Sequence, residues 1–593
     1  MTTRRTTRKA GKASSNQRTV IFIAISGALL LCLCAALALI FVPARTGTEG
    51  PGSSLQPDVR SATLVIAHSP EKAALIRSLV ETFNGQEQRT PDREKMRIDL
   101  IELTPEDMVN QTLAGANAFQ AMTPDSSVWL DQLNRRWAQT QGDQVEPGSI
   151  TSSLTGEPVR YAISPIVIAA WEEVARSLGW PDQPVSWSTL QQRAQDDPNF
   201  RWSHPSTAYA SGLLATLAEF YAGAGVQRGL TAEMAQDPKT VEYVTAIEKS
   251  VKYYGEAELA VIDRITEDPS ALDAFVVSEQ LIIAFNTRGA AGRGTGSNTD
   301  IAAAPRGKLV ALYPAEGAFW ADHPLALLES AALGDNQRRT FQAFREYLAG
   351  AEAQKMILGA GYRPTDLSLS LTGEGSLFAA ANGVDPAQPQ TTLQLPSSDV
   401  VQVVQNVWAL TKRKTNVFLV VDTSGSMDGD KLDGAKAALR TFLAQIPSDQ
   451  ERVGLVEFNT GVANIIELDL LANNRSILNN SVDSLDANGN TALLDGVRTA
   501  YGRLQQAGDA ERINAIVAMT DGRENASMVT LRQLEREIQS GNQNLPVVIF
   551  CIAYGRDADY DVLQAIAGAS GGQVREGDEE TIRELYKILS SYF

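Results

Sequence analysis

Residues 416–433 read NVFLVVDTSGSMDGDKLD, and this stretch decides the fold of the C-terminal part of the chain. A run of apolar residues ends in Asp422, and a polar turn, Thr423–Ser426, follows at once. Such a run is typical of a strand buried on both faces, as in a mostly parallel sheet covered by helices. Ligands of open α/β sheets bind where the chain leaves the carboxyl ends of the strands. We therefore expect the turn after Val421 to carry a site.

Strand-like and helical segments alternate from this point to the C-terminus. Apolar runs predict strands at Asn416–Val421, Arg452–Phe458, Ile513–Met519 and Leu545–Ala553. Helical spacing of apolar residues predicts helices near Asp430–Gln445, Ala492–Gln506, Leu531–Gln539, Asp559–Ala567 and Glu579–Ser591. This order predicts a doubly wound, mostly parallel α/β sheet over residues 414–593.

Oxygen-bearing side chains follow three of the predicted elements. Asp422, Ser424 and Ser426 occupy alternate positions of the first turn, which by itself also fits a helix cap. Two further segments argue against chance, because Thr491 precedes a predicted helix and Asp521 directly follows another buried strand. A doubly wound sheet brings these loops to one edge. Oxygen ligands alone suit a hard cation such as Mg²⁺, Mn²⁺ or Ca²⁺ better than zinc.

The same motifs carry a family resemblance over about residues 414–593. They are Asp422-Thr423-Ser424-Gly425-Ser426, Thr491 and Thr520-Asp521-Gly522, in this order and context. This set closely resembles the von Willebrand factor A domain with its metal-ion-dependent adhesion site.

The resemblance implies a role for each of the five positions. Ser424, Ser426 and Thr491 would bind the metal through their hydroxyls. Asp422 and Asp521 would act directly or through water, as groups that orient the other ligands. Three neutral hydroxyls leave a divalent ion under-neutralised, so a carboxylate of a partner protein can complete its coordination.

Residues 62–365 also alternate between strand and helix patterns and carry a second resemblance. It rests on the segments LVIAHSPEK at 64–72, PDSSVW at 124–129, ISPIVI at 163–168, YPAEG at 313–317, DHP at 322–324 and GYRP at 361–364. Together they look like an extracellular solute-binding protein of the two-lobed periplasmic type. The resemblance implies two α/β lobes around a cleft that can close on a ligand.

Hydroxyl groups at strand ends and helix starts are the candidate ligand-binding residues of this part. They are Ser69, Ser126, Ser164, Ser206 and Tyr313, and they could hold a small polar or anionic solute. Structural roles compete with this interpretation, because Ser69 can cap a helix and Ser164 can simply end a strand.

The N-terminus predicts a membrane anchor. Residues 1–18 hold six basic residues and no acid, and residues 19–42 are uncharged and mainly apolar. A helix of this length can cross a bilayer, and the basic flank predicts a cytoplasmic N-terminus with the bulk of the chain outside. A cleaved signal peptide is the alternative, although its apolar region is usually shorter. Residues 43–61 predict a flexible stalk, and residues 366–413 a linker with a connecting helix.

Composition and motifs narrow the function further. The net charge of −18 disfavours nucleic acid as a partner, and a surface so acidic favours cations or basic groups. Only three histidines occur, and neither a nucleophile elbow nor a phosphate-binding loop is present, so we expect no enzyme. The favoured function is metal-dependent recognition of an acidic group on a partner protein. The alternative is an anchored solute receptor that serves an ABC-type permease.

Overall fold

The computed structural model describes residues 61–141, 153–252, 254–255, 257–288, 306–329, 333–446, 448–555, 557–578 and 582. The predicted membrane helix over 19–42 and the stalk up to residue 60 lie outside these ranges, as does nearly all of the predicted helix near Glu579–Ser591. Among the helices within them, none is both long and apolar enough to cross a membrane.

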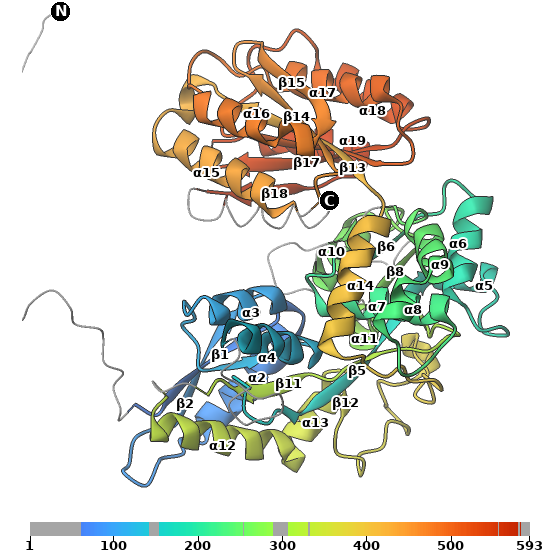
Figure 1. Ribbon diagram of the computed structural model, residues 1–593, viewed down its shortest axis with the longest axis vertical. Coiled ribbons are helices and arrows are strands. Elements are labelled where there is room, and N and C mark those ends of the chain that lie inside the picture. Colours follow the sequence, from blue (N-terminus) through green and yellow to red (C-terminus); the bar gives the residue numbers. More distant parts are fainter. Residues whose placement is uncertain are drawn as a thin grey trace, which may run out of the picture. The chain divides into compact units, whose positions relative to one another are not determined.

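The first lobe is a five-stranded sheet with helices around it (Figure 1). Its strands run in the order β2 (Arg97–Glu102), β1 (Thr63–His68), β3 (Ala121–Thr123), β11 (Pro324–Leu327) and β4 (Val159–Arg160). Its helices are η1 (Pro70–Lys72), α2 (Ala73–Gly85), α3 (Pro105–Leu113), α4 (Val128–Gln141), α12 (Asp335–Ala349) and α13 (Ala351–Gly359). The strand β1 is parallel to both neighbours, so the chain leaves β1 and β3 at the same edge.

The second lobe is built on the long strand β5 (Ala162–Trp171). Its sheet has the order β10 (Trp320–Ala321), β5, β8 (Ala274–Ser278), β6 (Trp202–Pro205) and β7 (Tyr254–Gly255), while β9 (Leu309–Leu312) and β12 (Arg363–Pro364) also pair with β5. Its helices are α5 (Glu172–Ser177), α6 (Trp187–Asp196), α7 (Ala210–Ala224), α8 (Ala232–Gln236), α9 (Pro238–Glu248), α10 (Glu258–Glu267) and α11 (Glu279–Arg288). Nearly every residue of β5 is buried.

The segment after the second lobe is packed against that lobe rather than extended. It contains η4 (Ala380–Asn382) and α14 (Ser398–Thr411). Val401, Val404 and Trp408 lie at helical spacing on α14 and are buried, and this apolar face packs against α7, α8 and α9. The connecting helix is therefore part of the hydrophobic core of the second lobe (Figure 1).

The C-terminal domain is a six-stranded sheet. The order is β15 (Val462–Leu470), β14 (Arg452–Phe458), β13 (Thr415–Asp422), β16 (Ile513–Thr520), β17 (Val547–Tyr554) and β18 (Val574–Gly577). All pairs are parallel except that of β14 with the edge strand β15. The helices are η5 (Gly425–Met427), α15 (Asp430–Gln445), α16 (Leu471–Ser484), α17 (Leu493–Ala507), α18 (Leu531–Gly541) and α19 (Tyr560–Ser570).

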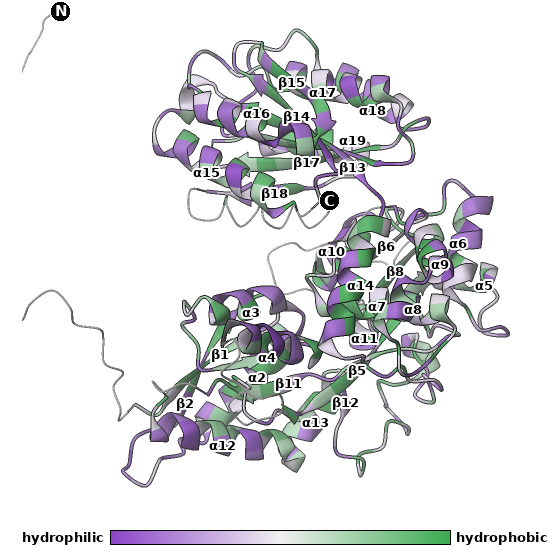
Figure 2. Ribbon diagram, viewed as in Figure 1, coloured by the Kyte–Doolittle hydropathy of each residue, from purple (hydrophilic) through white to green (hydrophobic). Residues whose placement is uncertain are grey.

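Alternate residues of the central strand β13 face opposite layers. Val417, Leu419 and Val421 join the apolar layer covered by α15 and α16, whereas Phe418 and Val420 join the layer covered by α17, α18 and α19. Figure 2 shows the strands β5 and β17 in the green of hydrophobic residues, while helix α12 is largely purple. Burial of both faces explains why these strands read as continuous apolar runs.

The four strands and first four helices predicted for the C-terminal domain are all present, with ends shifted by no more than two or three residues. Neither β15 nor α16 was predicted from the sequence. The strand β15 lies at the edge of the sheet with most of its residues exposed or half-buried, so it lacks the apolar run that marks the inner strands.

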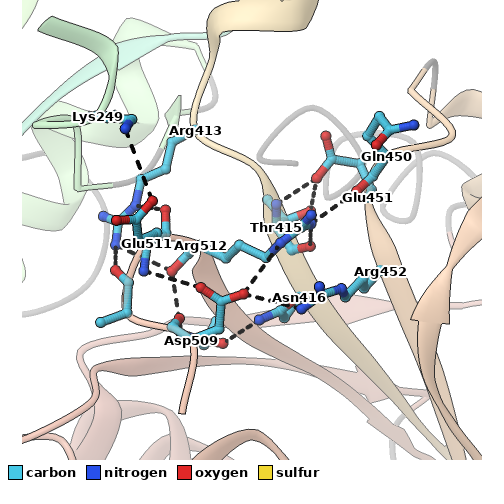
Figure 3. Close-up of polar contacts among 12 residues, drawn as sticks. Lys249, Arg413, Thr415, Asn416, Gln450, Glu451, Arg452, Asp509, Glu511 and Arg512 are labelled. Carbon is cyan, nitrogen blue, oxygen red and sulfur yellow. Dashed lines mark hydrogen bonds and ion pairs between the residues drawn. The ribbon is translucent and has the colours of Figure 1, made fainter. Parts of the chain in front are cut away.

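Arg413 lies just before β13 and joins several backbone groups (Figure 3). Its amide donates to the hydroxyl of Tyr254 at 2.8 Å, and its guanidinium donates to the carbonyls of Val251 at 3.2 Å and Ala510 at 2.7 Å. These contacts fix the chain at the point where α14 leads into the C-terminal sheet.

Gly454 provides a test of the sheet packing. It lies on β14 opposite Phe418, and a Cβ atom there would lie 2.4 Å from the Phe418 ring. We expect Gly454→Ala to lower the free energy of unfolding by about 1–3 kcal/mol, because overpacking forces the ring to move. Urea unfolding followed by circular dichroism measures the change. Gly461→Ala is the matched control, since its Cβ would meet nothing within 4 Å, and an equal loss in both variants would contradict the packing.

Candidate functional site

Asp422 is the last residue of the buried strand β13 and is itself buried. One carboxylate oxygen accepts a hydrogen bond from the amide of Ser424 at 2.7 Å, and the other accepts one from the hydroxyl of Thr520. Burial raises the pKa of Asp422 to about 6, although these hydrogen bonds oppose the shift. The carboxylate is therefore held rigidly, in surroundings where its negative charge is poorly solvated.

The two serines of the turn lie between this carboxylate and the neighbouring strand β16. The hydroxyls of Ser424 and Ser426 are 3.1 Å apart, and that of Ser426 donates to a carboxylate oxygen of Asp521 at 2.6 Å. Ser424 is buried, whereas Ser426 is exposed. The hydroxyl of Ser424 thus lies inside the protein at the edge of the sheet, and that of Ser426 lies on the solvent side.

Thr491 enters from the loop before α17. Its amide donates to the side chain of Asn525 at 3.0 Å, and its carbonyl accepts from the amide of Asn525 at 3.1 Å, so the loop is fixed from both sides. A Cβ atom on Gly522 would lie 3.0 Å from the Thr491 hydroxyl and 3.3 Å from that of Ser426. The two hydroxyls therefore converge over a residue that has no side chain of its own.

These contacts bring all five predicted residues to one edge of the sheet. We refer to Asp422, Ser424, Ser426, Thr491 and Asp521 as the sheet-edge site. All the side-chain atoms of this site that could bind a metal are oxygens, and they belong to three hydroxyl groups and two carboxylates. This is the ligand chemistry of a hard divalent cation, and the lack of a side chain at Gly522 leaves room beside the hydroxyls.

Lys431 is a component of the site that the sequence analysis missed. It lies in the first turn of α15, and its ammonium forms an ion pair with a carboxylate oxygen of Asp521 at 2.5 Å. The signal in the sequence was a single lysine nine positions after Asp422, which resembles any exposed lysine at a helix start. In the structure this lysine neutralises a fully buried carboxylate.

The five hydroxyl residues proposed for the solute-binding part do not form one group. Tyr313 lines a cavity of about 600 Å³ beside residues 180–185 and 380–391, and none of the four serines lines it. Its hydroxyl donates to Glu279, which also forms a bidentate ion pair with Arg363. Tyr313 and the four serines therefore do not line one cavity.

The four serines are all buried, and local contacts occupy most of their hydroxyls. The hydroxyls of Ser126 and Ser206 accept from backbone amides two residues ahead, at 3.3 and 3.4 Å, as in helix-start turns. Ser164 donates to the side chain of Gln280. Ser69 is the exception, because its buried hydroxyl, beside Asp125, has no hydrogen-bond partner among the described residues.

Charged side chains around Ser69 were not predicted. Glu71 and Asp125 of the first lobe and Glu258 of the second are buried close enough to act on one another electrostatically, and we call them the interlobe acidic cluster. Burial, then the charges of Asp125 and Glu258, raise the pKa of Glu71 well above its usual value. Burial raises the pKa of Glu258 to about 7. Lys72 is the buried cation of this group, 3.3 Å from Asp125.

Comparison with known proteins identifies both parts. Residues 64–363, half of the chain, match the family model of the bacterial extracellular solute-binding protein, and residues 416–587 match that of the von Willebrand factor type A domain. An uncharacterised protein of Synechocystis sp. is 30% identical over 30% of this chain and 42% of its own length. The chain thus spans less than half of that curated relative.

Two solved structures resemble separate parts of the chain. A von Willebrand factor type A protein from Catenulispora acidiphila is 27% identical over 30% of this chain and 43% of its own, with a TM-score of 0.27. The periplasmic binding protein AfuA from Actinobacillus pleuropneumoniae is 13% identical over 59% of this chain and 98% of its own, with a TM-score of 0.38. The chain belongs to the bacterial extracellular solute-binding protein family and carries a von Willebrand factor type A domain at its C-terminal end.

Proposed function

We propose that the chain recognises an acidic group on a partner protein through a divalent cation held at the sheet-edge site. The observation that carries this proposal is the convergence of three hydroxyls and two carboxylates at the end of β13 and β16. Ser424, Ser426 and Thr491 would be ligands, and Asp422 and Asp521 would orient them or bind through water. Mg²⁺ fits this oxygen set, with Mn²⁺ or Ca²⁺ as alternatives.

The distribution of charge and exposure explains how such a site would select its partner. The ion, when bound, would offer an open coordination position to a carboxylate oxygen at the solvent side. Ser426 is exposed while Ser424 and Thr491 are buried, so only that side is accessible to a second protein. The excess of acidic residues on the whole chain repels acidic proteins in general, and only a well-fitted carboxylate would overcome this repulsion.

A membrane anchor is part of the proposal. The uncharged segment at 19–42, preceded by six basic residues, would hold the chain in the cell membrane with its N-terminus in the cytoplasm. Both folded parts would then face outward, where a binding protein meets its partners. Binding rather than catalysis fits the sheet-edge site, because its five residues include no histidine or cysteine that could act as base or nucleophile.

A second candidate function is solute capture by the two lobes, as in a receptor that serves a permease. The interlobe acidic cluster favours it, since neither carboxylate oxygen of Glu71 has a hydrogen-bond partner among the described residues. The cluster holds three buried carboxyl groups and one buried lysine, which pairs with Asp125, so it favours a cationic solute over an anionic one. Without such a solute, protons on Glu71 and Glu258 would supply the positive charge that the bound solute provides.

Cation binding at the sheet-edge site is the first prediction of this proposal. Calorimetric titration of Mg²⁺, Mn²⁺ and Ca²⁺ into the EDTA-treated full chain should show a saturable site that is lost in an Asp422→Ala, Ser424→Ala double variant. Asp428→Ala is the matched control, because this exposed acid lies in the same turn but outside the ligand set. With the ion bound, peptides containing Asp or Glu should bind better than their Asn or Gln counterparts. Equal binding of cations by the double variant would contradict the proposal.

Lys431 is expected to compete with the cation for Asp521. Replacing it with methionine, which keeps the bulk of the side chain, should tighten Mg²⁺ binding by about tenfold, because a unit charge near the ion is removed. Lys436→Met on the same helix is the control, since the ammonium of Lys436 donates to the carbonyl of Asp483 at 3.4 Å and is not part of the sheet-edge site. Calorimetry measures both affinities. Weaker binding by Lys431→Met would show that the lysine assists the ion.

The interlobe acidic cluster predicts a pH dependence of stability. The pKa of Glu258 is about 7 in the folded chain and about 4.3 when unfolded, so its contribution to stability is present below pH 4.3 and is lost as the pH rises through 7. At pH 8 we expect Glu258→Gln to unfold with a free energy about 1–3 kcal/mol higher than that of the parent, and at pH 5 the gain should be smaller.

Urea unfolding at both pH values measures this difference. Glu267→Gln, an exposed carboxylate on the same helix, should change stability by less than about 0.5 kcal/mol at either pH. If Glu258→Gln destabilises the chain at pH 8, the ionised carboxylate of Glu258 stabilises the folded parent. That result would contradict the expectation that the negative charge of the acidic cluster is not fully neutralised.

A further inference from the structure

Three ionisable side chains meet in the core of the second lobe, far in sequence from the sheet-edge site. His204 lies on β6, Glu219 on α7, and Glu248 is the last residue of α9. Each is 0% exposed, and one nitrogen or oxygen atom of each lies within 4.8 Å of those of the other two. Charged residues are almost never buried this completely without a partner. We call this group the His204 triad.

The orientation of the imidazole is fixed by its neighbour in sequence. Nδ1 of His204 lies 2.9 Å from the carbonyl oxygen of Pro205, and because a carbonyl only accepts, Nδ1 carries the proton. The lone pair of the neutral ring is therefore on Nε2, which lies 3.5 Å from a carboxylate oxygen of Glu248. A ring nitrogen that donates to a backbone carbonyl while the other is directed at ligand atoms is the usual arrangement of a metal-binding histidine.

Glu219 is the least satisfied member of the triad. Neither of its carboxylate oxygens has a hydrogen-bond partner among the described residues, and the same holds for Nε2 of His204. A buried carboxylate without hydrogen bonds is strongly destabilising unless an ion or a proton neutralises it. Both oxygens of Glu219 are thus free to bind the same ion.

Glu248 is held in place by two donors. Its carboxylate accepts a hydrogen bond from the hydroxyl of Tyr254 at 2.6 Å and from the indole nitrogen of Trp408 at 2.5 Å. Hydrogen bonds of this kind orient metal-binding carboxylates in proteins. They leave the carboxylate close to Nε2 of His204.

We propose that His204, Glu219 and Glu248 bind a first-row divalent transition metal, with zinc as the ion that best matches the donors. One imidazole nitrogen and two carboxylates are common zinc ligands, whereas Mg²⁺ and Ca²⁺ prefer oxygen alone. With both carboxylates ionised beside a neutral imidazole, the triad carries a charge of −2, and a dication cancels it. The site therefore differs in chemistry from the sheet-edge site.

A metal at this position would stabilise the second lobe at a point that also involves α14. Its ligands come from β6, α7 and α9, and Trp408 of α14 bonds directly to the ligand Glu248. The ion would thus join four elements that are distant in sequence. Because every member is buried, we expect a closed structural site with slow exchange rather than a catalytic one.

A shared proton is the alternative to the metal. Burial and the charge of Glu248 raise the pKa of Glu219 well above its usual value, so in the absence of a metal this carboxyl holds a proton near Glu248. Glutamine is nearly isosteric with the protonated acid, so Glu219→Gln preserves the proton-sharing arrangement and removes the metal ligand. This variant therefore separates the two possibilities.

The test is the zinc content of the full chain, produced in zinc-supplemented medium and dialysed against EDTA, measured by mass spectrometry. We expect about one zinc per chain in the parent and at least a tenfold loss in Glu219→Gln. Glu316→Gln is the matched control, because this half-buried carboxylate lies in the same lobe outside the triad and should leave the zinc content unchanged. The Asp422→Ala, Ser424→Ala variant should also keep its zinc, which separates this site from the sheet-edge site.

Two results would overturn the proposal. One is a parent chain that holds no zinc and, after growth with Co²⁺, shows no visible absorption of bound cobalt; this readout applies even if Glu219→Gln fails to fold. The other is a folded Glu219→Gln variant, checked by circular dichroism, that holds as much zinc as the parent. Either result would leave the shared proton as the explanation of the triad.

Discussion

The strand β13 is buried on both faces, and its last residue, Asp422, leaves the apolar layers only at the carboxyl edge of the sheet. Its neighbour β16 runs parallel and in register, with Val421 opposite Met519, so both strands end at that edge. An antiparallel neighbour would have placed Asp521 at the opposite end. The parallel pairing is thus the reason that two carboxylates about a hundred positions apart meet at one site, and the loop before α17 adds Thr491 to the same edge.

The sequence predicted this domain well because strong, local patterns determine it. Continuous apolar runs mark strands that are covered on both faces, and the polar residues that follow them mark the ends of those strands. Among the described strands the edge strand β15 pairs with β14 alone, and its residues are exposed or half-buried, so they follow no such pattern. The family models match residues 64–363 and 416–587, and these ranges agree closely with the two regions, 62–365 and 414–593, whose motifs carried the family resemblances.

Charged partners were harder to predict than strands, because they depend on contacts that no local pattern records. Lys431 reads as a solvent-exposed lysine at a helix start, yet in the structure it pairs with Asp521, ninety residues away. Tyr313 was grouped with the serines as a hydroxyl near a strand end, but in the structure it bonds to Glu279 and lines a cavity that none of the serines lines. The His204 triad joins three elements whose sequences carry no metal-binding spacing.

These sites share one physical problem, the neutralisation of buried negative charge, and the chain solves it in three ways. At the sheet edge the ammonium of Lys431 lies against Asp521, as a tethered cation that a free ion could displace. Between the lobes, protons serve instead, because burial raises the pKa of Glu71 and of Glu258. In the His204 triad neither oxygen of Glu219 has a hydrogen-bond partner among the described residues. Since an ion pair or a proton weakens carboxylate–cation binding without abolishing it, the first two sites are suited to reversible binding. The metal proposed for the His204 triad would have to displace the proton of Glu219, and complete burial of the three ligands would then slow its release.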